Sequence, residues 1–166
     1  TSYIKTSGSS VTRLVDRCNN AGSSSLFNDN EGVLFAEISG LEGDDSVAQL
    51  GISNGSDNEN VKIIFLNLTT MLLEAKMTSY TNFAVAITIN RDNINKVAIQ
   101  YKANDYKVFV NGTKQSVTQV SATPTGLDRL NFDRGDGNSV FYGKVKQLIV
   151  FNEALSDSEL QTLTTL

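Results

Sequence analysis

The stretch Asn95–Lys114, NKVAIQYKANDYKVFVNGTK, decides the fold. Apolar and polar residues alternate on both sides of the short polar turn Ala103–Asp105, and a period of two indicates an antiparallel hairpin. One face of such a hairpin packs on a core while the other stays wetter. Asn111–Gly112 accepts positive φ, which predicts a second reversal into a strand over Lys114–Val120. The residues of the expected core face are Val97, Ile99, Tyr101, Tyr106, Val108 and Val110.

Short β-prone segments, separated by turns rich in Gly, Asn and Asp, lie on both sides of this hairpin. Thr1–Asp16 alternates loosely and predicts an edge strand or an extended clamp, and Thr70–Lys76 is ambiguous because it contains helix formers. The other expected strands are Gly32–Ser39, Ser46–Ser53, Val61–Leu68, Asn82–Asn90, Leu127–Asp133 and Ser139–Asn152. About ten short strands at regular spacing predict an all-β fold, a two-sheet antiparallel sandwich of the jelly-roll kind.

Alternation within two of these segments indicates which residues face the core. In Gly32–Ser39 the better core face is Leu34, Ala36 and Ile38. In Asn82–Asn90 the expected core face is Phe83, Val85, Ile87 and Ile89.

The end of the chain has a helical pattern instead. Ser156 and Glu159 have the spacing of a capping box, and Leu155 and Leu160 have that of a hydrophobic staple. The pattern predicts one short helix from Asp157 to about Thr164, with Leu160 and Leu163 facing the body.

Composition excludes several classes of function. The chain has 166 residues, enough for one domain over 1–166, and because it begins at Thr1 we expect it to be excised from a longer chain. The net charge is −4 with scattered basic residues, which argues against nucleic acid, and no long apolar run suits membrane insertion. Histidine is absent, so the commonest general base is missing, and Cys18 has no second cysteine to pair with.

Six segments of the chain can be compared with those of a known family. They are Thr1–Arg13, Phe27–Glu37, Lys96–Gly112, Pro124–Leu130, Tyr142–Phe151 and Asn152–Leu163. Taken in order along the chain, these segments resemble the laminin-G-like, concanavalin A-like domains of tailed-phage fibres and related virion proteins, although Lys5 stands where that family usually carries proline. The resemblance implies a jelly-roll module on a virion surface that meets the host. Members of the wider superfamily bind glycans or calcium, and others are only structural.

Glycoside hydrolysis is the activity to exclude first, because this fold also hosts glucanases. Such enzymes hold two carboxylates about 5 to 9 Å apart. Their Glu–x–Asp–x–x–Glu pattern does not occur in this chain, and Glu31 and Glu37 are six positions apart. We therefore expect a protein that is not an enzyme.

The loop Asp133–Asn138, DRGDGN, offers hard oxygen ligands. Asp133, Asp136 and Asn138 suit Ca²⁺, although the late glutamate of a helix-loop-helix calcium loop is missing. The alternative is a glycine-rich turn between strands. No other cofactor is expected.

Aromatic side chains are the second kind of candidate, because sugar rings stack on aromatic faces. We expect Phe109, Tyr106 and Tyr142 to contact a ligand, with Tyr80 and Tyr101 also available. Phe109 falls on the outward face of the hairpin, and the alternative is that it packs against the other sheet, a helix or a neighbouring subunit. Tryptophan is absent, which argues against a strong flat sugar platform.

These observations leave three hypotheses open. The first is a non-enzymatic virion surface or fibre domain for adhesion or display, which binds a host-surface glycan or polymer weakly and gains avidity from copy number. The second is a structural domain that trimerises a fibre or decorates a capsid. The third is a carbohydrate-binding module of a secreted polysaccharide-degrading enzyme, and would be extracellular.

Overall fold

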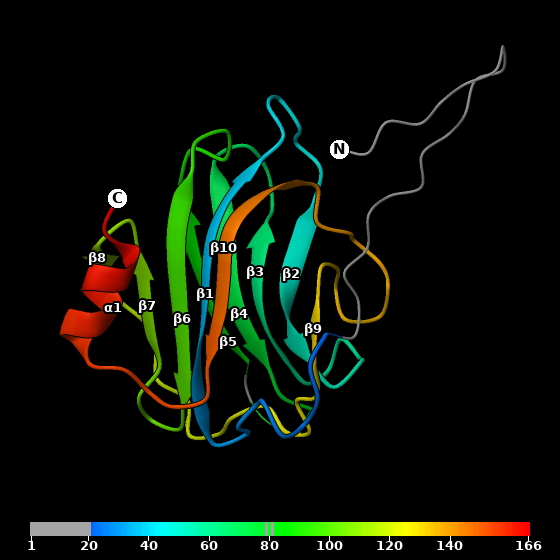
Figure 1. Cartoon of the computed structure of the whole chain (residues 1–166), viewed down its shortest axis with the longest axis vertical. Coiled ribbons are helices and arrows are strands. Elements are labelled where there is room, and N and C mark those ends of the chain that lie inside the picture. The colour runs from blue at the N-terminus through cyan, green and yellow to red at the C-terminus, as the bar shows by residue number, and fades with distance from the viewer. Residues whose placement is uncertain (1–20, 79, 81) are drawn as a thin grey trace, which may run out of the picture.

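The computed structural model describes residues 21–78, 80 and 82–166. Two antiparallel five-stranded sheets pack face to face, and one short helix follows near the C-terminus (Figure 1). The predicted all-β, two-sheet sandwich is confirmed. The predictions for Thr1–Asp16 and Cys18 concern residues outside the described part of the chain.

The two sheets are named here by their place in Figure 1. The front sheet has the order β10-β1-β6-β7-β8, and the back sheet has the order β5-β4-β3-β2-β9. The front strands are Glu31–Gly40 (β1), Asn95–Lys102 (β6), Lys107–Val110 (β7), Thr113–Lys114 (β8) and Gly143–Phe151 (β10). The back strands are Ala48–Ser53 (β2), Asn60–Phe65 (β3), Thr70–Lys76 (β4), Phe83–Thr88 (β5) and Arg129–Asn131 (β9).

The core lies between the sheets and is filled by the predicted alternate residues. Every residue of the expected core face of the hairpin belongs to the main apolar cluster, as do Leu34, Ala36 and Ile38 of β1. Phe83 is buried in the same cluster, and Val85, Ile87 and Ile89 pack against it. The period-two reading of the sequence is therefore confirmed in both sheets.

Two segments show where local propensity and final structure diverge. Thr70–Lys76 is a strand, because pairing with β3 on one side and β5 on the other outweighs its helix formers. The strand predicted over Lys114–Val120 is wrong, since β8 ends at Lys114. The positive φ of Asn111 (50°) and Gly112 (77°) does reverse the chain as expected.

Helix α1, Asp157–Thr164, begins and ends where the capping box predicts. The backbone N–H of Ser156 donates to Glu159 Oε2 (2.8 Å), and the N–H of Glu159 donates to Ser156 Oγ (3.3 Å). Leu160 is fully buried, and Leu155 packs in the same cluster. The helix therefore covers part of the outer face of the front sheet, beside β6, β7 and β8 (Figure 1). Among the described residues, no helix has the length and apolar character that crossing a bilayer requires.

Candidate functional site

Phe109 is a core residue and cannot reach a ligand in this structure. Its side chain is 3% exposed and lies in a second apolar cluster with Val33, Phe35, Ala98 and Leu160. The outward face of the hairpin is thus covered by α1, and the alternative that Phe109 packs against a helix is the one the structure shows.

Tyr106 is buried as well, at 1% exposure. Its ring stacks on Phe83 with centroids 4.6 Å apart, and its hydroxyl donates to the carbonyl oxygen of Ala122 (2.9 Å). Burial raises the pKa of Tyr106 above its ordinary value of 10.0, so the hydroxyl stays a donor at physiological pH. Tyr106 therefore holds the backbone near Ala122 instead of touching a surface ligand.

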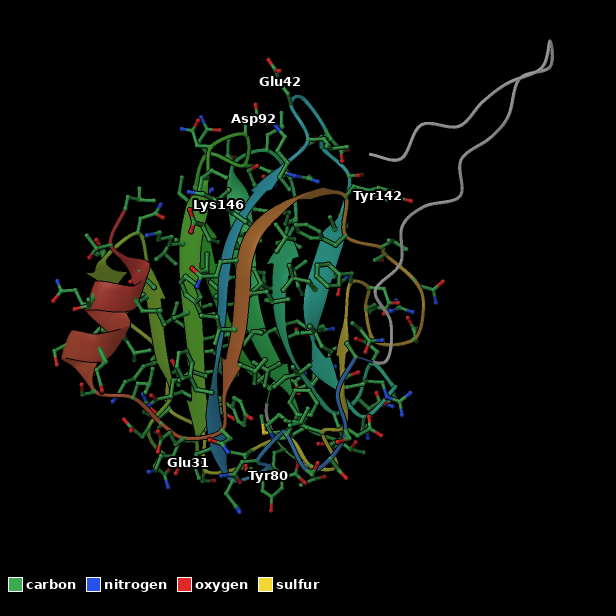
Figure 2. The ribbon with its side chains drawn as sticks, in the orientation of Figure 1. Glu31, Glu42, Tyr80, Asp92, Tyr142 and Lys146 are labelled. Atoms are coloured by element: carbon green, nitrogen blue, oxygen red, sulfur yellow. The ribbon has the colours of Figure 1, made fainter. Side chains whose placement is uncertain are left out.

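Of the three predicted ligand-contacting aromatics, Tyr142 alone is at the surface, at 40% exposure. Figure 2 places it toward the end of the sandwich that also carries Glu42 and Asp92.

The predicted calcium ligands do not converge. Asp133 is buried, and its Oδ1 accepts from the N–H of Gly135 (2.6 Å). Asp136 is exposed and bound to the Arg134 guanidinium, which holds the pKa of that carboxyl well below its ordinary value. Asn138 is exposed and donates its backbone N–H to Asp136 Oδ1 (3.1 Å). Within the described ranges, no three His, Cys, Asp or Glu side chains are grouped to hold a metal.

The two glutamates of β1 are too far apart for glycoside hydrolysis. Six residues of extended chain separate Glu31 from Glu37 by about 20 Å, beyond the roughly 5 to 9 Å that the reaction uses. Glu31 pairs with Lys102 and Glu37 with Lys146, both across neighbouring strands. Figure 2 shows Glu31 and Lys146 well separated along the sandwich.

Tyr80 is the aromatic side chain that the structure singles out. It lies in the turn between β4 and β5, is 60% exposed, and projects from the end of the sandwich where Glu31 also lies (Figure 2). Two surface pockets, of about 380 and 310 Å³, share this residue as part of their lining. An exposed tyrosine that helps to line two hollows is thus the main feature of this end.

The two pockets are lined mainly by amides and hydroxyls. We call this group of residues the Tyr80 site. The first pocket is formed by Tyr80, Asn104, Thr118, Gln119, Val120 and Ser121, and the second by Asn58, Lys76, Met77, Thr78, Tyr80 and Asn82.

Glu59 holds two loops at this end. Its Oε1 accepts from the N–H of Thr78 (2.9 Å), and its Oε2 accepts from the N–H of Thr125 (2.8 Å). Partial burial alone would raise the pKa of Glu59, but these hydrogen bonds outweigh it and the pKa is lowered below 4.5. The carboxylate therefore fixes the wall of the second pocket.

Gln119 fixes the wall of the first pocket. Its Oε1 accepts from the N–H of Tyr106 (2.7 Å), and its Nε2 donates to the carbonyl oxygen of Tyr106 (2.9 Å). The side-chain amide thus pairs with the backbone as a neighbouring strand would. The N–H of Asn104 also donates to the carbonyl oxygen of Val120 (2.8 Å), which ties the turn between β6 and β7 to this wall.

One cation lies in the second pocket. Lys76 Nζ binds Asp57 Oδ2 at 2.8 Å, and the side chains of these residues are 28% and 26% exposed. Asp57 also binds the buried Lys62. Lys62 also lies 3.4 Å from Glu74, so the two lysines face two carboxylates, and Lys76 is the cation that lines the pocket beside amide and hydroxyl groups.

Several solved structures have a fold similar to that of this chain. The chain is similar to the CBM40 module of the Ruminococcus gnavus IT-sialidase bound to α2,3-sialyllactose, with a TM-score of 0.69, 16% identity, and coverage of 89% of this chain and 94% of that one. It is also similar to a leech intramolecular trans-sialidase, with a TM-score of 0.68, 18% identity and coverage of 90% of this chain and 26% of that longer one. A heptameric SAP-like pentraxin from Limulus polyphemus gives a TM-score of 0.64 at 14% identity, over 87% of this chain and 73% of that one.

No family model matches the sequence, and no curated protein sequence matches it significantly. The structural likeness shows the fold, a jelly-roll β-sandwich. The predicted fold, including its jelly-roll character, is thereby confirmed.

Proposed function

We propose that this domain is a glycan-binding module and that the Tyr80 site binds the sugar. The observation that carries the proposal is that the exposed Tyr80 lines two pockets formed mainly by residues with amides and hydroxyls. A sugar ring stacks its C–H face on an aromatic ring, while amide and hydroxyl groups beside it pair with the sugar hydroxyls. The site presents both elements side by side.

The structural neighbours support binding of the same chemical class. One is an isolated carbohydrate-binding module with sialyllactose bound, which is an acidic glycan. Lys76, in the second pocket of this chain, supplies a cation that suits a sugar carboxylate. We therefore expect acidic glycans to bind more tightly than neutral ones of the same size.

Two of the three sequence-based hypotheses describe a biological setting in which this domain would bind a glycan. A non-enzymatic module next to a secreted glycan-degrading enzyme is supported by the sialidase neighbours, which include isolated modules. Adhesion from a virion fibre is supported by the sequence resemblance. In either setting several copies compensate for weak single sites, and in a fibre a trimer would supply them. The structural hypothesis, trimerisation or decoration without a ligand, is the alternative that glycan binding tests.

The test is a glycan array followed by calorimetric titration of the best acidic oligosaccharide. Tyr80→Ala should weaken binding about five-fold or more, because loss of a stacked ring removes about 1 kcal/mol or more. Tyr142→Ala is the matched control, since Tyr142 is also exposed but lies elsewhere on the sandwich. Equal loss in both variants would move the site away from Tyr80, and a uniformly flat array would reject glycan binding.

A further inference from the structure

Asp133 is a buried carboxylate with no cation paired to it among the described residues. Its side chain is 2% exposed, and Oδ1 accepts from the N–H of Gly135 and from Asn131 Nδ2 (3.3 Å). Within the described part of the chain, Oδ2 has no hydrogen-bond partner. Arg134, the next residue along the chain, binds Asp136, and Lys62 binds Asp57. A buried carboxylate without a counter-charge is strongly unfavourable, so something must neutralise it.

Two buried amide oxygens in this part of the back sheet are also without partners. Among the described residues, Gln49 Oε1 and Asn131 Oδ1 accept no hydrogen bond, and their side chains are 6% and 4% exposed. In the β2–β9 ladder Asn131 pairs with Gly51. Gln49 comes two residues before Gly51, and Asp133 comes two residues after Asn131. Because β2 and β9 are antiparallel, both steps run toward the same end of the sheet. The period of two puts the side chains of Gln49 and Asn131 on the outer face of the back sheet, and the hydrogen bond from Asn131 Nδ2 places the Asp133 carboxylate beside Asn131 in the bend after β9.

The loop that follows Asp133 closes over this position. Val140 forms a bridge with Gln49, and the backbone at Gly135 lies so close to β2 and its following turn that a Cβ there would be 2.8 Å from the carbonyl oxygen of Ser56. The N–H of Arg134 donates to the carbonyl oxygen of Asn138 (2.8 Å), which gives the loop a compact form. The three unpartnered oxygens are thus enclosed between β2, β9 and this loop.

We propose that Gln49, Asn131 and Asp133 bind a calcium ion. Calcium takes six to eight oxygen ligands, and carboxylate and amide oxygens are among those it prefers. Backbone carbonyls or water complete the coordination. Asp133 was also a calcium ligand in the sequence-based prediction. The other two predicted ligands, Asp136 and Asn138, are replaced by Gln49 and Asn131.

The strength of binding follows from the charge of the ligands. Three side chains with a single carboxylate give a weak site, with a dissociation constant on the order of 10⁻⁴ to 10⁻³ M. A bound ion ties the loop to β2, so its effect is on stability. The calcium site and the Tyr80 site share no residue, and each can fail without the other.

Thermal unfolding of the chelator-treated protein with added calcium tests the proposal. At about 10 mM calcium the midpoint should rise by roughly 3 to 8 °C, since binding to the folded state alone stabilises it. Magnesium, which requires near-ideal octahedral geometry, should give less than half of that shift. No shift with calcium would overturn the proposal.

Two variants test the ligand set. Gln49→Leu removes one unpartnered oxygen without changing the charge, and should fold and lose most of the calcium shift. Asp136→Asn is the control, because it changes a charge in the same loop at a carboxylate held by Arg134, and should keep the shift. A full shift in Gln49→Leu, or its loss in Asp136→Asn, would show that the assigned ligands are wrong.

Discussion

Gly51 of β2 lies directly opposite Lys62 of β3, and the lysine side chain occupies the space that a Cβ on the glycine would need. That Cβ would lie 2.8 Å from Lys62 Cγ, with the carbonyl oxygen of Val61 closer still. The missing side chain lets Lys62 lie flat along the sheet, where it is 2% exposed and reaches Asp57 and Glu74 (3.4 Å).

Gly51→Ala should therefore destabilise the fold, although alanine suits a strand better than glycine does. Overpacking of this kind costs about 1 to 3 kcal/mol, measured as the free energy of unfolding in urea. Gly43→Ala is the control, because nothing lies within 4 Å of its Cβ and only its φ of +71° opposes the change. A loss at Gly51 no larger than that at Gly43 would contradict this account.

Asp57 should make the free energy of unfolding depend on pH in the acidic range. Partial burial would raise its pKa, but hydrogen bonds and charge from Lys62 and Lys76 outweigh it, so the pKa is lowered below 3.8. A depressed folded-state pKa gives stability that is present above the unfolded pKa and is lost as pH falls through the folded one. The free energy of unfolding should therefore fall as pH drops below about 4.

Asp57→Asn separates this group from the other carboxylates. At pH 7 it should cost about 3 kcal/mol, because the buried Lys62 loses its closer partner. As the pH falls below about 4 the difference between the variant and the wild type should narrow, since the wild type progressively loses the stability that the charged carboxylate supplies. Urea titrations at pH 7, 4 and 3 measure the difference, and a gap that stays constant with pH would refute the assignment.

Much of the fold was predictable because each strand carries its own period of two. That pattern indicates which residues share a face, and it identified the core side of the hairpin correctly. It does not indicate what covers the opposite face. Phe109 was therefore predicted to contact a ligand, whereas Leu160 of α1, 51 positions later, packs on that face.

The site was less predictable, because its parts are distant in the sequence. The pockets around Tyr80 combine residues from 58 to 121, and the amide pairing of Gln119 with Tyr106 replaces an expected strand. The available signal was a tyrosine within the polar turn between two strands. Such a residue cannot pack into the core without burying the turn's backbone, which favours exposure.

The capping box of α1 should control access to the cluster around Phe109. Ser156→Ala removes the hydroxyl that accepts from Glu159 N–H and should cost about 1 kcal/mol. Because α1 is short and packs on one face, amide hydrogen exchange should accelerate in 157–164 and little elsewhere. Thr162→Ala is the control, since that exposed hydroxyl only donates to Ser158 O, and exchange as fast as in Ser156→Ala would argue against capping.

Glu59→Gln tests whether the Tyr80 site depends on its scaffold. The glutamate accepts one backbone N–H on each oxygen, whereas glutamine has one acceptor oxygen, so either the loop at Thr78 or the one at Thr125 must lose its bond. We expect faster amide exchange in one or both loops and glycan affinity reduced about three- to ten-fold, with a stability loss of about 1 to 2 kcal/mol. Glu42→Gln is the control, because Glu42 is exposed at the opposite end of the sandwich (Figure 2). Unchanged affinity despite faster exchange would mean that the sugar does not contact these loops.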